Sequence, residues 1–406
     1  MKNNKQPLVS ILLSIYKVEE YLEECLDSIL AQSYENLEVV CVDNGSPDKC
    51  GEILKKYAQK DKRIKIVTLK ENRMLCGGRN AGLDNATGDF ICFVDPDDWI
   101  EKDHIKAMVE AIQTQKDSEG KPYNLVVNTN AVNYYILDNG SVQILHDYKR
   151  PEQEISIDDI NKNSRIETDI PMWGRLYRKS FLDKYKDVRF LEGFNTDNIP
   201  YTMKLLAHMG HFYQIYPLKN ARYWRRMITP EGAITSVVLF KNMEIPFCLE
   251  NLYDYLKENG MEQKVRVMFH LFFTICFPRH KDMPKYYQVF KNLMIKMEND
   301  IKSAPEGVYA QEDIDLCNLL IYTDNFFQFT DLYFRPIPTS HTKLIKKIKL
   351  LGIPFLKIKI NPKKQKKYYL FSIPIWSIRY KQSKIQYRLF CVFPIVTIQI
   401  KEKCSY

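Results

Sequence analysis

The chain has 406 residues, enough for two or three domains, and a formal net charge of +9. Its ten cysteines include no Cys-x-x-Cys pair and its seven histidines form no ligand cluster, which argues against a zinc site or a disulfide framework and indicates a reducing cytosol. The polar start, Met1 to Gln6, predicts no signal peptide, and no apolar run is suited to span a bilayer.

The first hundred residues alternate between apolar strands and helical stripes. Between the first two strands, apolar residues recur at helical spacing over 19–32, and Ser46 and Pro47 predict the N-cap and first turn of the next helix. This alternation predicts βαβ units and a mostly parallel sheet flanked by helices, an α/β fold. The predicted strands are 9–15, 37–42, 64–69 and 90–94.

Polar side chains follow three of these strands at the point where each strand ends. They are Asp43, the loop from Asn72 to Asn80, and the group Asp95 to Asp98. Ligands bind at the carboxyl edge of such sheets, so we expect these groups to share one crevice. The Asp-x-Asp pattern suits Mg²⁺ or Mn²⁺, which take oxygen ligands and share them with substrate phosphates. The alternative is a helix N-terminus rich in Asp, where negative charge is favourable.

The same residues resemble the family 2 glycosyltransferases, which have the GT-A fold. The resemblance covers about the first hundred residues, and the order and spacing of the motifs match throughout. It is carried by Val9-Ser10-Ile11, Val42 to Asp48, Gly78 to Gly82, Ala86 to Ile91 and Asp95 to Trp99.

The resemblance implies a donor site for a UDP-sugar. Asp43 resembles the carboxylate that reads the uracil edge, and a carboxylate is suited to accept from a ring N–H. Arg79 resembles the arginine that contacts the base or the phosphates, Asp95 would bond the ribose or sugar hydroxyls, and Asp97 resembles the metal ligand. The donor-binding set also includes Ser14, Tyr16 and Arg226. The alternatives are a turn residue at Asp43 and a surface cation at Arg79.

Asn44 departs from the family pattern, in which a second Asp is common. One acidic residue remains beside it, so nucleotide binding is still expected.

An inverting transferase also needs a general base within reach of the acceptor hydroxyl. By resemblance Asp197 is the candidate, although Thr196 stands where the family usually has Glu; the alternative is an N-cap aspartate, and Glu192 is the reserve candidate. Trp173 resembles the tryptophan that shapes the acceptor side, and Arg226 belongs to a basic segment that often closes over the diphosphate. The Gln-x-x-Arg-Trp motif of processive synthases is absent, which favours an enzyme that adds one or a few sugars.

The tail from 341 to 406 has sixteen Lys or Arg and one acid, a net charge of +15, which leaves residues 1–340 at −6. It repeats with a period of twenty residues, marked by Pro354, Pro374 and Pro394, and short alternating stretches predict strands. Basic and aromatic residues in amphipathic pieces suit an anionic membrane surface. A packing or homo-oligomerisation module and nucleic acid are the alternatives, and no nucleic-acid motif accompanies the charge.

The predicted organisation is a GT-A catalytic domain over 1–230, a helical region over 235–335 and the basic tail over 341–406. The chain is predicted to be a metal-dependent inverting hexosyl- or N-acetylhexosaminyltransferase. Its predicted location is the cytoplasm, peripheral on the inner face of the cell membrane. Its acceptor would be a surface glycan such as capsule or lipopolysaccharide, or a lipid-linked oligosaccharide. The alternatives are an inactive GT-A-like binding or scaffolding protein and a nucleotidylyltransferase, although the latter class has a Gly-rich loop after the first strand that is absent here.

Overall fold

The structure is a computed structural model, and the chain divides into two compact units, Met1–Asp315 and Leu316–Tyr406. The described residues are 6–128, 130–137, 139–147, 152–156, 172–194, 198–215, 220–227, 244–261, 283–303, 311–324, 344–350, 353–360, 366–370, 373–374, 378–381 and 384–387.

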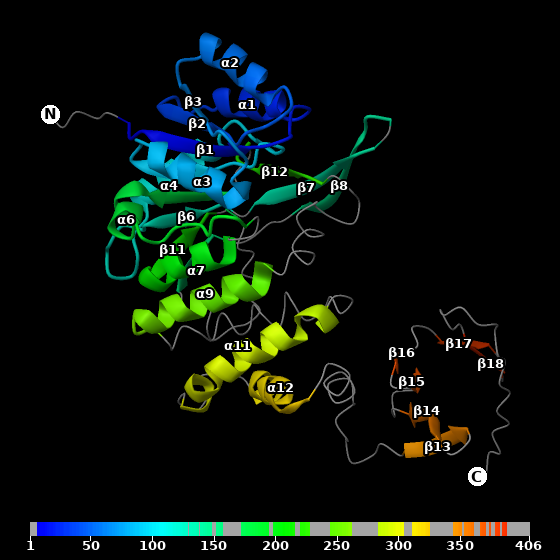
Figure 1. The fold of residues 1–406 in the computed structure, drawn as a ribbon. Coiled ribbons are helices and arrows are strands. Elements are labelled where there is room, and N and C mark those ends of the chain that lie inside the picture. The colour runs from blue at the N-terminus through cyan, green and yellow to red at the C-terminus, as the bar shows by residue number, and fades with distance from the viewer. Residues whose placement is uncertain are drawn as a thin grey trace. The chain divides into compact units, whose positions relative to one another are not determined.

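The first unit is built on an eight-stranded sheet whose first half is parallel, as the alternation of strands and helices predicts (Figure 1). The strands of this half lie in the order β3-β2-β1-β4, and Ile15 at the end of β1 pairs with Asp43 at the end of β2. Their carboxyl ends therefore share one edge of the sheet. The bounds are β1 (Val9–Ile15), β2 (Leu37–Asp43), β3 (Ile64–Thr68) and β4 (Phe90–Phe93).

The second half of this sheet is mixed. β10 runs antiparallel to both β4 and β6, β11 runs parallel to β6, and β9 closes the edge antiparallel to β11. The antiparallel β10 brings the segment after residue 172 back beside β4, where the Asp-rich loop begins. The bounds are β6 (Leu125–Val127), β9 (Gln153–Ser156), β10 (Arg175–Arg178) and β11 (His211–Gln214).

A smaller sheet with the order β5-β12-β7-β8 adjoins the Asp-rich loop. β5 (Trp99–Ile100) follows that loop directly and pairs antiparallel with β12 (Tyr223–Arg226). β12 runs parallel to β7 (Ala131–Ile136), and β7 forms a hairpin with β8 (Val142–Asp147). This sheet carries the basic segment of β12 to the acidic end of β4.

Helices cover both faces of the larger sheet. Ile11 and Leu13 of β1 belong to a buried core with α1 (Leu22–Leu30), α2 (Cys50–Lys60) and α4 (His104–Thr114). On the other face α3 (Met74–Asn85) packs against β1 and β2, where a Cβ on Gly82 would lie 3.5 Å from the Leu12 side chain.

The predicted N-cap at Ser46 is wrong, because α2 begins four residues later, after Lys49. The Ser46 hydroxyl instead donates to Asp48 Oδ1 at 2.5 Å and accepts the Lys17 N–H at 2.8 Å. Ser46 therefore ties the loop after β2 to the loop after β1.

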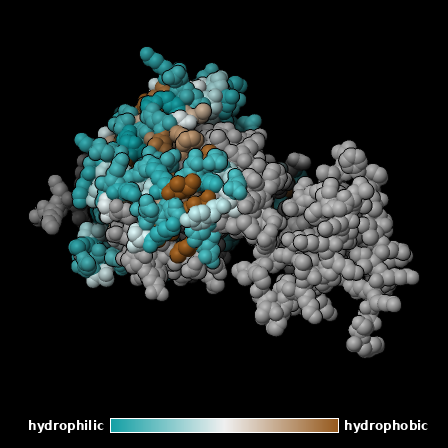
Figure 2. All heavy atoms as spheres, turned by 60° about the horizontal axis from the view of Figure 1, so that its bottom comes forward, coloured by the Kyte–Doolittle hydropathy of each residue, from teal (hydrophilic) through white to brown (hydrophobic). Residues whose placement is uncertain are grey.

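The described residues between 179 and 322 include five more helices. The coloured part of the face shown in Figure 2 is mainly hydrophilic, with small apolar patches. Pro246 and Pro284 lie in the first turns of α9 and α11, where a missing N–H costs nothing. None of the described helices is both long and apolar enough to cross a membrane. The bounds are α6 (Lys179–Lys184), α7 (Asn198–His208), α9 (Glu244–Glu258), α11 (Met283–Ser303) and α12 (Gln311–Tyr322).

The second unit contains short antiparallel strands, of the kind that the alternation of the tail predicts. Pro354 and Pro374 lie in β14 and β16, and Pro394 lies outside the described residues. The bounds are β13 (Leu344–Leu350), β14 (Ile353–Ile360), β15 (Lys366–Leu370), β16 (Ile373–Pro374), β17 (Ile378–Lys381) and β18 (Lys384–Tyr387).

His104, at the start of α4, is completely buried under the smaller sheet. Its Nδ1 lies 2.9 Å from the Ala221 carbonyl oxygen, and the Asn128 amide also donates to that oxygen at 2.7 Å. Burial lowers the pKa of His104 to about 4, so the imidazole is neutral in the folded protein at neutral pH.

This buried imidazole predicts a loss of stability in acid. In the unfolded chain His titrates near pH 6.5, so protonation favours the unfolded state as pH falls from about 6.5 to about 4, by up to about 3 kcal/mol. We expect urea unfolding midpoints measured at pH 7 and pH 4.5 to differ less in His104→Gln than in the wild type. His211→Gln, at a half-exposed position, is the control; an unchanged pH dependence in His104→Gln would contradict the prediction.

Candidate functional site

Three carboxylates follow β4 in a tight turn closed by a hydrogen bond from the Asp98 N–H to the Asp95 carbonyl oxygen at 3.0 Å. The Asp95 N–H donates to the buried hydroxyl of Tyr223 at 3.0 Å, and Asp98 accepts the Arg226 backbone N–H at 2.8 Å. Both contacts come from β12, so the smaller sheet holds the acidic turn in place.

The acidic turn concentrates negative charge in a poorly solvated place. Burial first, and then the charge of Asp95, together raise the pKa of Asp97 to about 6. Burial likewise raises the pKa of Asp98 well above its usual range, with Asp97 and Asp95 adding to the effect. An added cation would relieve this repulsion.

The acidic turn fits a divalent metal that is shared with a phosphate ligand. Among the described residues no set of three or more His, Cys, Asp or Glu side chains is grouped to enclose an ion. Mg²⁺ commonly takes one or two carboxylates and completes its shell with water and substrate phosphates. Asp97 with Asp95 can supply those carboxylates, so the donor set fits such an ion.

Arg79 links α3 to the acidic turn. Its guanidinium Nη2 lies 3.0 Å from Asp95 Oδ1, and the Arg79 side chain is only 5% exposed. The same guanidinium lies 5.7 Å from the centre of the Phe190 ring. The structure therefore brings together two residues, Arg79 and Asp95, that the sequence assigns to donor binding.

Arg226 is engaged by the protein itself. Its guanidinium forms an ion pair with Glu24 of α1, its Nε donates to the Asp97 carbonyl oxygen at 3.2 Å, and it lies over the Tyr21 and Tyr134 rings. Arg226 is 8% exposed. These contacts indicate that Arg226 holds the acidic turn against α1.

Arg225, the neighbouring residue, is half-buried and points to the other face of β12. Its guanidinium lies 5.1 Å from the centre of the Trp173 ring, and its charge lowers the pKa of both Asp97 and Asp98. Arg225 is therefore a second cation beside the acidic turn, in the basic segment 223–226 from which the sequence singles out only Arg226 as a donor-binding residue. Strand alternation indicates this position, because it places the Arg225 side chain on the same face of β12 as Tyr223.

Trp173 lies beneath this arrangement and is only 3% exposed. Its ring stacks on Tyr223 with centroids 4.8 Å apart, and its backbone bridges to Phe93 at the end of β4. The Trp173 ring thus packs against both the Tyr223 ring and the Arg225 guanidinium.

Asp43, Ser14 and Tyr16 lie at the carboxyl ends of β2 and β1, as predicted. Asp43 is largely buried, and its Oδ1 accepts the Ser46 N–H at 3.0 Å. A Cβ on Gly78 would lie 2.0 Å from Ser14 Oγ, so only glycine allows α3 to approach β1 this closely. Tyr16 is half-buried, with the Lys17 ammonium 5.4 Å from its ring centre.

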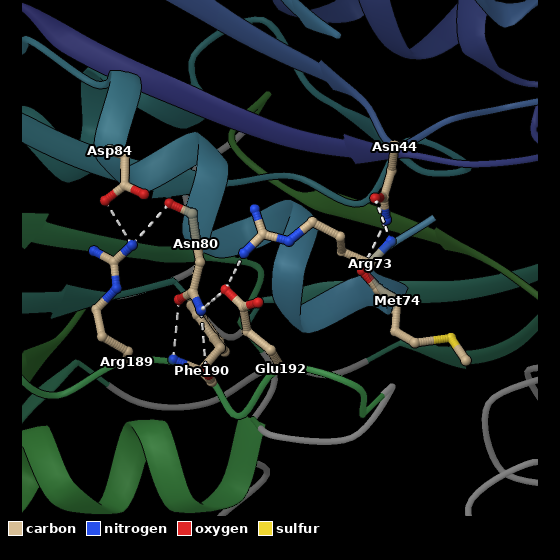
Figure 3. Close-up of polar contacts among 8 residues, drawn as sticks. All are labelled: Asn44, Arg73, Met74, Asn80, Asp84, Arg189, Phe190 and Glu192. Atoms are coloured by element: carbon tan, nitrogen blue, oxygen red, sulfur yellow. Dashed lines mark hydrogen bonds and ion pairs between the residues drawn. The ribbon is translucent and has the colours of Figure 1, made fainter. Parts of the chain in front are cut away.

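Asn44 clamps the loop that leads into α3 (Figure 3). Its Oδ1 accepts the Arg73 N–H at 3.0 Å, and its Nδ2 donates to the Met74 carbonyl oxygen at 2.7 Å. Met74 has a φ of +57°, a left-handed conformation that is unusual for a side chain of this size. An ionised Asp could accept but not donate, so the amide explains the departure from the family pattern.

Asn80 joins α3 to the segment 189–192 (Figure 3). Its Oδ1 accepts the Phe190 N–H at 3.1 Å and its Nδ2 donates to the Phe190 carbonyl oxygen at 2.9 Å. Arg189 reinforces the junction by donating to the Asn80 carbonyl oxygen at 3.0 Å and to Asp84 at 2.6 Å. The sequence does not indicate this role of Asn80, because its partner Phe190 lies 110 residues away in the chain.

Glu192, the reserve candidate for the base, forms an ion pair with Arg73 (Figure 3). The hydrogen bond from Arg73 lowers the pKa of the Glu192 carboxyl, which makes it a weaker proton acceptor. Asp197 and Thr196 lie outside the described residues.

Known proteins share the N-terminal part of this chain. Residues 10–122 match the family model described as glycosyl transferase family 2. Glycosyltransferase GlyA of Streptococcus pneumoniae serotype 4 is 32% identical over 180 residues, 44% of this chain and 25% of GlyA. Minor teichoic acid biosynthesis protein GgaB of Bacillus subtilis (strain 168) is 40% identical over 95 residues, 23% of this chain and 11% of GgaB. The chain thus spans a quarter or less of the length of these relatives.

The fold is shared with solved structures. The crystal structure of S. aureus TarS 1-349 matches with a TM-score of 0.57 at 20% identity, covering 85% of this chain and 98% of that one. The structure of TarS 1-349 in complex with UDP-GlcNAc matches with a TM-score of 0.52 at 21% identity, covering 78% and 86%. The expected α/β fold of GT-A type is confirmed.

The Asn80 junction predicts a specific stability defect. Asn80→Ala leaves the N–H and C=O of the buried Phe190 without these partners, which should lower the free energy of unfolding by about 2–4 kcal/mol. Asn85→Ala on the same helix is the control, because the Asn85 side chain donates only to the Ala81 carbonyl oxygen at 2.9 Å, and the change should cost less than about 1 kcal/mol. Equal losses in denaturant titrations of the two variants would contradict this role.

Proposed function

We propose that the chain, whose residues 10–122 match the family model of the family 2 glycosyltransferases, transfers a sugar from a UDP-sugar to a hydroxyl group. The acceptor would be a growing surface glycan or a lipid-linked oligosaccharide. The observation that carries the proposal is the acidic turn after β4, with Arg79 paired to Asp95 at 3.0 Å. The fold shared with TarS 1-349 in complex with UDP-GlcNAc supports a nucleotide-sugar donor.

The proposed reaction is a direct displacement with inversion. The acceptor oxygen forms the new bond to the anomeric carbon, and the bond to the diphosphate oxygen breaks as UDP departs. Asp197 takes the proton of the acceptor hydroxyl as general base, a role that the ion-paired Glu192 is less suited to fill.

The departing diphosphate needs positive charge close to it. Asp97 and Asp95 would hold Mg²⁺ or Mn²⁺, which neutralises phosphate charge when bound. Arg225 is a further cation on this side, since its charge already acts on Asp97 and Asp98. Arg226 would contribute by fixing the acidic turn through Glu24 and the Asp97 carbonyl oxygen.

The nucleoside would bind at the carboxyl ends of β1 and β2. Asp43 would accept from the uracil N–H, with Ser14 and Tyr16 beside it. Close packing of Gly78 on Ser14 and the Asn44 clamp on Arg73 and Met74 support this assignment, because they give the crevice a fixed wall.

We place the catalytic domain over residues 1–230, the helical region over 235–335 and a membrane-binding module over 341–406. With a net charge of +15, the tail would hold the enzyme peripherally on the anionic inner face of the cell membrane. Homo-oligomerisation through the tail is the alternative.

Release of UDP from a panel of UDP-sugars with Mn²⁺ or Mg²⁺, in the presence of lipid-linked oligosaccharide acceptors, tests the proposed activity. Asp97→Asn should reduce the rate by about 100-fold or more, because charge stabilisation of the leaving group is lost, and Asp197→Ala should abolish turnover while UDP still binds. Asp183→Asn, at an acid that is 60% exposed, should keep full activity. Full activity of Asp97→Asn would refute the metal assignment, whereas UDP binding without turnover on any acceptor would favour a scaffolding protein.

Removal of residues 341–406 tests the tail. The truncated protein should sediment far less with vesicles rich in phosphatidylglycerol, because each cation near an anionic surface contributes about 1 kcal/mol. Its affinity for UDP, measured by calorimetry, should match that of the full chain. Undiminished vesicle binding would refute the membrane role of the tail.

A further inference from the structure

The tip of the β7–β8 hairpin exposes a group of aliphatic side chains. Ile136, Leu137, Val142 and Ile144 are 41%, 37%, 56% and 52% exposed. They make up half of the eight large hydrophobic residues that are exposed in the described part of the chain, and they fall within nine consecutive positions. Single exposed apolar residues need no explanation, but a local cluster of this kind indicates an interaction surface.

The cluster has a defined shape. Ile136 pairs with Val142 and Tyr134 pairs with Ile144, so these four residues share one face of the hairpin. The turn is closed by the Leu137 N–H donating to the Ser141 carbonyl oxygen at 2.9 Å and the Gly140 N–H donating to the Leu137 carbonyl oxygen at 2.8 Å. The hairpin projects away from the larger sheet (Figure 1), so this apolar tip is presented outward.

The apolar face begins at the candidate active site. Tyr134, at the base of the face, lies edge-on to Trp224 with centroids 5.8 Å apart, and its ring is 5.2 Å from the Arg226 guanidinium. Tyr134 pairs with Ile144, and the next pair on the same face toward the tip is Ile136 with Val142. The hairpin that exposes the aliphatic residues is thus joined to β12 by the pairing of β7 with β12.

We propose that the tip of the β7–β8 hairpin docks into the boundary between headgroups and acyl chains of a lipid bilayer. Its exposed large side chains are all aliphatic, whereas protein–protein interfaces are enriched in Tyr, Trp, Met and Arg. Four side chains also cover far less than the about 800 Å² per partner that a stable protein complex buries. Shallow insertion into lipid needs only a small apolar projection, and the tail of +15 supplies an independent attraction to the same kind of surface.

Docking at this tip would set the orientation of the site. With the tip in the bilayer, the crevice beside Trp224 and Arg226 lies close to the membrane surface, within reach of a sugar carried on a lipid. This consequence rests on the proposed function, whereas docking of the hairpin does not.

The test uses the full chain with the double variant Ile136→Ser/Val142→Ser. Binding is measured by sedimentation with phosphatidylcholine vesicles and with vesicles that also contain phosphatidylglycerol, at low and at high salt. High salt and neutral lipid suppress the contribution of the tail but not that of apolar insertion. Under those conditions we expect the partition coefficient of the double variant to fall about tenfold or more.

The control is Phe247→Ser/Ile295→Ser, which removes two side chains that are 48% and 47% exposed elsewhere in the same unit. This variant should bind vesicles as the wild type does. Equal partitioning of all three proteins would overturn the inference, and so would a lipid-independent change of oligomeric state in the hairpin variant alone, which would identify a second copy as the occupant. Vesicle binding is read without turnover, so an inactive protein that still docks would refute only the proposed function.

Discussion

The crowding of three carboxylates at the end of β4 is the constraint on which the site depends, with Asp98 buried and Asp95 and Asp97 partly exposed. Removing charge from water is costly unless partners compensate for it, and here Asp95, Asp97 and Asp98 also repel one another. Compensation comes from elements far apart in the chain. Arg79 on α3 pairs with Asp95, the charge of Arg225 on β12 acts on Asp97 and Asp98, and the Arg226 N–H donates to Asp98. The smaller sheet and α3 therefore both contact the acidic turn.

Two consecutive residues of α3 contact different parts of the first unit. Arg79 turns toward the acidic turn, whereas Asn80 grips the backbone of Phe190 at the start of the segment that leads to residue 197. Phe190 itself stacks on Tyr201 of α7 with ring centroids 3.8 Å apart. A short stretch of one helix thus fixes the acidic turn and the segment 189–192 relative to each other.

The proposed membrane contacts rest on two segments of different chemistry. The tail sequence has a high density of positive charge, and its attraction to anionic lipid would weaken with salt. The tip of the β7–β8 hairpin is aliphatic, and its affinity for a bilayer would depend on buried area instead. Charge attracts at a distance without fixing orientation, whereas an apolar tip joined to β12 would orient the site.

The four parallel strands, the edge at which they end and the acidic turn there follow from the sequence pattern alone, because apolar runs bounded by polar residues specify buried strands locally. Contacts between residues far apart in the chain depend on the tertiary structure, because a local sequence pattern does not specify them. The Arg226 guanidinium pairs with Glu24, 202 residues earlier in the chain, and the charges of both Arg226 and Arg225 act on Asp97. Ser46 ties two loops together instead of capping a helix. The side chains of Asn44 and Asn80 accept hydrogen bonds from backbone N–H groups 29 and 110 residues away, and these partners come together only when the chain folds.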